Sequence, residues 1–165
     1  MKRASFLFAF SLIAMLSFAA INTSVVGHAS VTIVDGIAAS ETQQLNFGSI
    51  DASPVEGTVT VTYNGDRTTS GGVTEVGTGF SSGSFTITGN PEVVLTYVVQ
   101  ATPITLLGNT TGQPISVELF TASASDGLTN ENGIAILKVG ATATIPANIP
   151  SDVYRGTYDV TIAHE

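Results

Sequence analysis

A strict alternation of apolar and polar residues near the end of the sequence places the strongest constraint on the fold. Tyr158, Val160 and Ile162 carry large apolar side chains, and Asp159 and Thr161 lie between them. Successive side chains of an extended strand point to opposite faces of a sheet, so this spacing puts the apolar ones on a single face. The pattern predicts a half-buried β-strand whose neighbours must be supplied by earlier segments.

Much of the remaining sequence repeats this extended pattern in short runs. The clearest run, residues 57–63, alternates Thr with Val and Tyr, and Asn64-Gly65 follows at once. Asn-Gly tolerates the positive φ angles of a tight hairpin, which predicts a returning segment over residues 66–76. Further runs rich in Val, Ile, Thr and aromatic residues occupy residues 45–50, 80–89, 93–99, 104–107, 115–120 and 134–145.

Two of these runs have additional features. Residues 93–99 are nearly continuous in apolar side chains, which predicts a central strand covered on both faces. A helix there is disfavoured because β-branched and aromatic residues dominate and no capping residues frame the run. In the long run 134–145, Gly140 marks a bulge or bend. About nine or ten short strands, with no helix expected after a cleaved signal-peptide helix in residues 1–29, predict a single all-β domain, an immunoglobulin-like antiparallel β-sandwich.

The first 29 residues have the composition of an export signal. Lys2-Arg3 is basic, residues 6–16 are apolar, and small-residue cleavage sites follow at Ala19 and Ala29. A retained membrane helix is the alternative, but it needs roughly 20 apolar residues, and serines interrupt this run. We expect cleavage after Ala29 in preference to Ala19. The mature chain is then exported to the periplasm and on to the cell surface, a fimbria or the medium, with no integral membrane segment.

Charge and cysteine content exclude several classes of function. The full chain has five basic and thirteen acidic residues; removal of the signal leaves three basic ones and a net charge of −10. Such an acidic surface repels phosphate backbones, so no nucleic-acid partner is expected. The sequence contains no cysteine, which rules out disulfides, thiolate metal sites and cysteine nucleophiles.

Candidate catalytic groups do not converge in the sequence. His164 is the single histidine after the signal, and it stands at the end of the last predicted strand. The many hydroxyl residues therefore lack a base that could activate them. Asp126 and residues 130–132 could offer oxygen ligands to calcium, but their spacing does not match an EF-hand, and a solvated turn is the expected structure. We expect no enzyme activity, no catalytic residue, no metal site and no cofactor.

Several motifs, taken together and in order, are similar to a known family. They lie at residues 45–50, 57–61, 67–73, 84–89, 137–143 and 154–162. As an ordered set they resemble the DUF4402 family of exported bacterial proteins, over nearly the whole chain after the signal. The closing Gly-x-Tyr-x-Val-x-Ile pattern is also similar to the last strand of chaperone–usher fimbrial subunits, including the spore-coat-U-like group.

This resemblance implies a pilin-like sandwich that lacks one strand. In those fimbrial subunits a chaperone strand fills the gap first, and the N-terminal extension of the next subunit fills it later. The donor residues implied here share one parity and are Val31, Ile33, Ile37 and Ala39, with Asp35 as the single polar residue among them. The acceptor-groove strand implied here is the closing one, with Tyr158, Val160 and Ile162.

These inferences divide the chain into a signal peptide (1–29), an N-terminal extension with a possible donor strand (30–42) and a β-sandwich domain (43–165). The function expected first is a structural subunit of a pilus, fimbria or cell-surface fibre that serves cell adhesion. Its partners would be copies of itself or related subunits, a periplasmic chaperone and an outer-membrane usher. The alternative is a monomeric, self-complemented sandwich that binds a ligand or belongs to the cell envelope. The two hypotheses differ in whether residues 31–39 pair within their own molecule or with a neighbouring one. We expect pairing with a neighbouring molecule.

Overall fold

The computed structural model describes residues 30–31 and 36–164, and the chain divides into two units, residues 1–32 and 33–165. The predicted signal peptide lies outside the described residues, as does Ile33 of the predicted donor segment. Every regular element in the described part of the second unit is a β-strand. No helix long and apolar enough to cross a membrane occurs in the described ranges.

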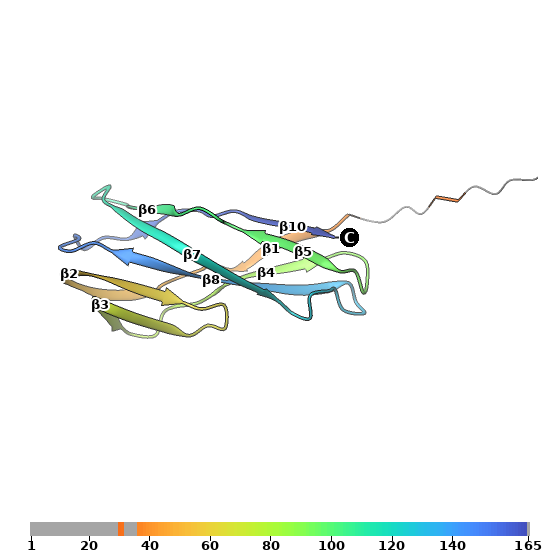
Figure 1. Cartoon of the computed structure of the whole chain (residues 1–165), viewed down its shortest axis with the longest axis horizontal. Helices are drawn as coiled ribbons and strands as arrows, with labels where there is room; N and C mark the ends of the chain where they lie inside the picture. The colour runs from red at the N-terminus through yellow and green to blue at the C-terminus, as the bar shows by residue number, and fades with distance from the viewer. Residues whose placement is uncertain (1–29, 32–35, 165) are drawn as a thin grey trace, which may run out of the picture. The chain divides into compact units, whose positions relative to one another are not determined.

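Ten strands of the second unit form one large and one small antiparallel sheet (Figure 1). The large sheet contains β1 (Ala38–Gln43), β2 (Ser49–Val61), β3 (Arg67–Val76), β4 (Gly83–Thr88), β6 (Ile104–Gly108), β7 (Pro114–Ala124), β8 (Ile134–Ile145) and β9 (Tyr154–Arg155). The small sheet pairs β5 (Leu95–Val99) with β10 (Val160–His164). Apolar residues of both sheets pack together in a shared core. The predicted all-β antiparallel sandwich is therefore confirmed.

The order of the strands matches an immunoglobulin-like frame. In the large sheet β1, β4, β8 and β7 are successive neighbours, which is the spatial order A-B-E-D of that frame. In the small sheet β5 beside β10 reproduces C beside F. The hairpin β2–β3 and the short strands β6 and β9 are additions. Figure 1 shows this hairpin at the opposite end of the domain from β5 and β10.

The large sheet is organised around β8. Residues 134–139 pair with β4 and residues 141–145 pair with β2, while β7 runs along the other edge. Gly140 lies where the partner changes, and a Cβ at this position would collide with the Val61 carbonyl of β2. The irregularity expected at Gly140 lies in the facing strand, where the register of β7 shifts between Glu118 and Thr121.

The predicted hairpin is confirmed as β2–β3, with Asn64-Gly65 at its tip. Gly65 has a φ of 88°, the left-handed conformation that glycine adopts without strain. The Thr62 amide donates to the Asp66 carbonyl at 2.9 Å and closes the turn. The local Asn-Gly signal was therefore sufficient to locate this connection.

Arg67 holds the base of the hairpin against the preceding loop. Its side chain is only 1% exposed and pairs with the Glu75 carboxylate at 3.4 Å. Nη1 donates to the Phe47 carbonyl at 3.2 Å, and Nη2 donates to the Gly77 carbonyl at 2.8 Å. The guanidinium also lies 4.4 Å from the centre of the Phe80 ring, a cation–π distance. The buried guanidinium thus links the start of β3 to the loop before β2 and to the residues that follow β3.

The prediction of a central strand over residues 93–99 is wrong. β5 begins at Leu95 and lies in the two-stranded sheet, where Leu95 is buried but Val98 is 65% exposed. Val94, just before the strand, is 50% exposed. The apolar run therefore covers a single face, and its length alone could not show whether another layer packs over the second face.

Two clusters of buried residues make up the core. The first joins β2, β3, β7 and β8, and its buried members are Val59, Val73, Ile115, Val117, Ala141, Ala143 and Ile145. The second lies between the two sheets, and its buried members are Ile87, Leu95, Ala135, Leu137 and Val139. Phe120 packs partly buried against both clusters. We call the two regions the hairpin half and the small-sheet half.

Candidate functional site: the open edge of the small sheet

One edge of β10 has no partner strand among the described residues. On its other edge β10 pairs with β5, from Val160 opposite Val99 to His164 opposite Leu95. In the immunoglobulin-like frame, strand G lies on this second edge of strand F, and residues 36–164 supply no strand there. Unpaired N–H and C=O groups along an edge form a template for another strand.

The side chains along this edge are incompletely covered. Val160 and Ile162 pack against the buried cluster of the small-sheet half, as does Tyr158 just before the strand, yet all three remain half-buried. On β8 the same alternation leaves Leu137 and Val139 fully buried. Because β8 has partners on both edges, the contrast follows from the missing neighbour of β10. We define the open edge as the unpaired edge of β10 with these three side chains.

Tyr158 spans the interior at one end of the open edge. Its ring centre lies 5.4 Å from that of Phe120 and meets the ring of Phe85 edge-on at 6.2 Å. Its hydroxyl reaches the backbone of Gly83 in β4, where a Cβ would collide with it. Burial raises the pKa of the Tyr158 hydroxyl to about 12, and the nearby negative charge of Glu41 adds to the shift. The hydroxyl is buried and has no hydrogen-bond partner within the described part of the chain.

β1 forms the corresponding edge of the large sheet. It pairs with β4 alone among the described strands, and all six of its residues are exposed. Ala39 lies opposite Ile87 and Glu41 lies opposite Phe85, so these two side chains share the core-facing side of the sheet. A carboxylate on the inward side of an edge strand remains hydrated here because nothing described covers it.

The structure separates the residues predicted to form a donor strand. Ala39 lies inside β1, paired with β4 of its own molecule, and Ile37 packs half-buried against Gly89. Val31, in the first unit, is 84% exposed. Ile33 lies outside the described residues. Residues 38–42 of the predicted N-terminal extension therefore lie in β1, paired within their own domain.

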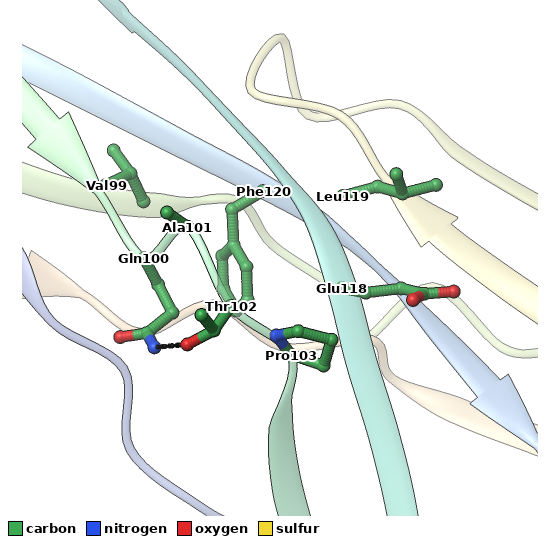
Figure 2. A pocket seen from close by; sticks show the side chains of 8 residues that line it. All are labelled: Val99, Gln100, Ala101, Thr102, Pro103, Glu118, Leu119 and Phe120. Atoms are coloured by element: carbon green, nitrogen blue, oxygen red, sulfur yellow. Dashed lines mark hydrogen bonds between the residues drawn. The ribbon is translucent and has the colours of Figure 1, made fainter.

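A second concavity of about 330 Å³ lies between the end of β5 and the bulge of β7. Figure 2 shows the Phe120 ring inside it, while the Leu119 side chain points away. Gln100 Nε2 donates to Thr102 Oγ1 at 2.9 Å, and Gln100 Oε1 accepts from the Asp159 backbone amide at 3.2 Å. Both polar atoms of the Gln100 side chain therefore already have hydrogen-bond partners within the protein. The lining residues are Val99, Gln100, Ala101, Thr102, Pro103, Glu118, Leu119 and Phe120. A single carboxylate among these residues defines no reaction.

Groups that could hold a metal ion do not gather in the described ranges. No three His, Cys, Asp or Glu side chains cluster there, and His164 is exposed at the end of β10. In the 125–133 loop, Asn130 Oδ1 accepts hydrogen bonds from the amides of Asn132 and Ile134. The oxygen considered for calcium therefore closes a turn. The open edge, with its unpaired backbone groups and half-buried apolar side chains, is therefore the candidate functional site of the described domain.

The fold and this edge define an immunoglobulin-like sandwich in which, among the described residues, the F strand of the small sheet is paired on one edge only. The model of one family, a domain of unknown function designated DUF4402, matches residues 37–164. The chain belongs to this family, and the match begins one residue before β1. No curated protein and no solved structure matches the chain.

Sequence reasoning missed three parts of the site. The Phe120 ring under Tyr158 is placed by the bulge in β7, at the left-handed residue Leu119 with a φ of 52°. Gly83 leaves room for the tyrosine hydroxyl, and Glu41 stands across from it on β1. Only Glu41 gave a sequence signal, as the one charged residue of its strand, and its partner could not be inferred without the sheet register.

Proposed function

We propose that the chain is a structural subunit of a pilus, fimbria or other cell-surface fibre. Subunits would join when the N-terminal segment of one molecule pairs with β10 of the next. The observation that carries the proposal is the open edge: an F strand with an unpaired edge and half-buried apolar residues, in a fold where a G strand belongs. Adding a strand there would satisfy edge hydrogen bonds and cover apolar side chains at once.

The length of the segment between the predicted cleavage site and the family match fits this role. Residues 30–36 precede the first residue of the family match, and an extended chain of this length spans about 23 Å at roughly 3.3 Å per residue. The five residues of β10 span about 17 Å on the same measure. Gly36, the last residue of this segment, would give the chain freedom to turn from the neighbour back into its own β1.

The proposed contact is heterologous, because it joins two different surfaces of the same subunit. Such a contact does not close on itself and propagates into a filament. The proposal includes export, with a periplasmic chaperone strand protecting the open edge before assembly at an outer-membrane usher. It includes no catalysis.

A pair of matched substitutions tests strand donation. Ile33 and Thr32 are adjacent, so in an extended strand their side chains point to opposite faces. We expect Ile33→Asp to abolish multimers that survive SDS without boiling, because it places a charge against the core, whereas Thr32→Asp should leave them intact. A purified chain that stays monomeric, or multimers that survive Ile33→Asp, would overturn the proposal.

The self-complemented monomer is the competing function, and one observation favours it. Ala39, a residue of the predicted donor segment, already pairs within its own domain. If the remaining residues also complete the small sheet of their own molecule, the purified chain will be a cooperatively folded monomer, and Ile33→Asp will destabilise that monomer.

A further inference from the structure

Glu41 carries an inference about which free edge of the domain accepts a strand, and this inference rests on the proposed function. Among the described strands, β1 pairs with β4 alone and β10 pairs with β5 alone. Both strands therefore present backbone N–H and C=O groups to which a strand of a second copy can add. Ordered assembly through β10 requires that β1 does not pair in the same way.

The open edge lacks the features that discourage pairing. Edge strands that stay single usually carry a lysine, a proline, a bulge or a charge that points inward. β10 pairs with β5 in unbroken register, and its sequence, Val-Thr-Ile-Ala-His, contains no lysine, proline or acidic residue. Its inward side chains, Val160 and Ile162, are apolar and half-buried. A strand added there covers apolar surface and meets no charge of β10 on the inward side.

β1, in contrast, carries two of these features. Glu41 lies directly opposite Phe85, which packs against the buried cluster of the small-sheet half, so the carboxylate is on the core-facing side. Its charge also acts on the interior residue Tyr158. In addition, the register of β1 against β4 shifts between Glu41 and Gln43, and such an irregularity bends an edge strand.

Pairing at β1 would remove water from the Glu41 carboxylate. A strand added to the unpaired edge of β1 places its own inward side chains beside Glu41, at the spacing of cross-strand neighbours. No basic side chain of the described domain forms an ion pair with Glu41, since the one ion pair there joins Arg67 and Glu75. A carboxylate that loses its water without gaining a partner is strongly unfavourable. The same desolvation does not arise at β10.

We propose that Glu41 directs strand addition to the open edge by making β1 unfit to pair with a second copy. Repulsion between two acidic chains does not select an edge, because it opposes contact through β1 and through β10 alike. An outward polar residue does not select one either, since it stays in water after pairing. The inward position of the carboxylate is therefore the property on which the choice depends.

Matched substitutions at adjacent positions test this role. Glu41→Val and Ser40→Val both add a β-branched side chain to β1, but the two side chains point to opposite faces. Each is placed in the full exported chain together with Ile33→Asp, which removes the proposed strand donation. We expect Glu41→Val to raise the weight-average mass in sedimentation to about twice that of the monomer or more, while Ser40→Val leaves it unchanged. Glu41→Lys should also stay monomeric, because an inward charge of either sign resists burial.

Hydrogen exchange locates the new contact. In the associated Glu41→Val chains, the amides of β1 should gain protection and those of β10 should not. The Tyr158 hydroxyl reports whether the fold is intact. Burial is the main cause of its raised pKa, so without Glu41 it should still titrate above the usual 10.0, though below about 12. If Glu41→Val does not fold, Glu41→Thr, which is uncharged but polar, takes its place.

A folded Glu41→Val chain that remains monomeric overturns the role of Glu41, and so does equal association of Ser40→Val or protection that appears in β10. These results leave strand donation standing. The proposed function fails by a different result, the absence of SDS-resistant multimers from the chain that carries no substitution.

Discussion

In the hairpin half of the domain β2, β3, β7 and β8 all contribute buried apolar side chains, whereas in the small-sheet half the inward side chains of β10 are only half-buried. β8 runs through both halves with the same two-residue alternation as β10. On β8 the inward residues are buried, for example Leu137 at 0% exposure, while Val160 and Ile162 are half-buried. The two strands have similar side chains, so the difference arises from their neighbours.

This contrast teaches that periodicity reports which face is apolar and not how completely it is covered. β8 has strands on both edges and a second layer over its core-facing side, and these together exclude water. β10 has one partner strand among the described elements. An alternating strand with a free edge is the condition in which a second molecule can complete the burial.

The largest expected effect compares one isoleucine from each half. Ile145 is 2% exposed, so Ile145→Ala should lower the free energy of unfolding by about 2–5 kcal/mol through lost contacts and the cavity left behind. Ile162 is half-buried, and Ile162→Ala should cost only about 1 kcal/mol in the isolated chain. Urea unfolding of the monomer measures both. Equal losses would mean that the edge of β10 is already covered.

A second comparison concerns two of the three basic residues of the domain. Arg67→Met should lower the unfolding free energy by about 3 kcal/mol, because it leaves the carbonyls of Phe47 and Gly77 without their donor. Arg155 is exposed, and Arg155→Met should change stability by about 0.5 kcal/mol or less. The same unfolding experiment checks both variants. A small effect at Arg67 would show that the hairpin half is held by its apolar contacts alone.

Local patterns were enough to predict much of this fold. The Asn64-Gly65 turn, the alternating runs and the lack of a helix within residues 36–164 followed from backbone preferences and side-chain periodicity within short windows. The sandwich itself followed from the number and spacing of these runs. Such features depend on residues close in sequence, and they are therefore readable without a structure.

The site could not be predicted to the same depth because it depends on long-range register. The exposed face of Val98 and the commitment of Ala39 to its own sheet follow from which strands are neighbours. The placement of Tyr158 against Gly83 joins residues from distant strands. No local pattern encodes these pairings, and the apolar run at 93–99 was misassigned for that reason.

The small-sheet half should lose stability at high pH. Burial holds the Tyr158 pKa at about 12 in the folded chain, above the usual 10.0, so the folded state retains the proton more tightly than the unfolded state. The resulting stability is fully present below pH 10 and is lost as the pH rises toward 12. Tyr158→Phe should flatten this loss in alkaline urea titrations, whereas Tyr63→Phe, altered in the hairpin half, should not.

The smallest expected effect appears at low pH, in the hairpin half. Asp152 Oδ2 accepts hydrogen bonds from the Thr111 amide at 2.7 Å, the Thr110 amide at 2.8 Å and the Thr111 hydroxyl at 2.8 Å. These bonds, first of all that from the Thr111 amide, lower the Asp152 pKa from 3.8 to about 2. The carboxylate ties the turn after β6 to the segment before β9.

Because the folded pKa of Asp152 lies below the unfolded one, its contribution to stability is present above pH 3.8 and is lost as the pH falls through about 2. Asp152→Asn keeps an oxygen acceptor but removes the charge, so stability between pH 4 and 2 should vary less than in the unaltered chain. Asp126→Asn removes a charge from an exposed loop and serves as the control. Acid unfolding of the three chains, followed by circular dichroism, decides the matter. If Asp152→Asn keeps the full acid dependence, the loss of stability at low pH arises from other groups. The hairpin half and the small-sheet half would then differ in how well they are packed, but not in their sensitivity to acid and alkali.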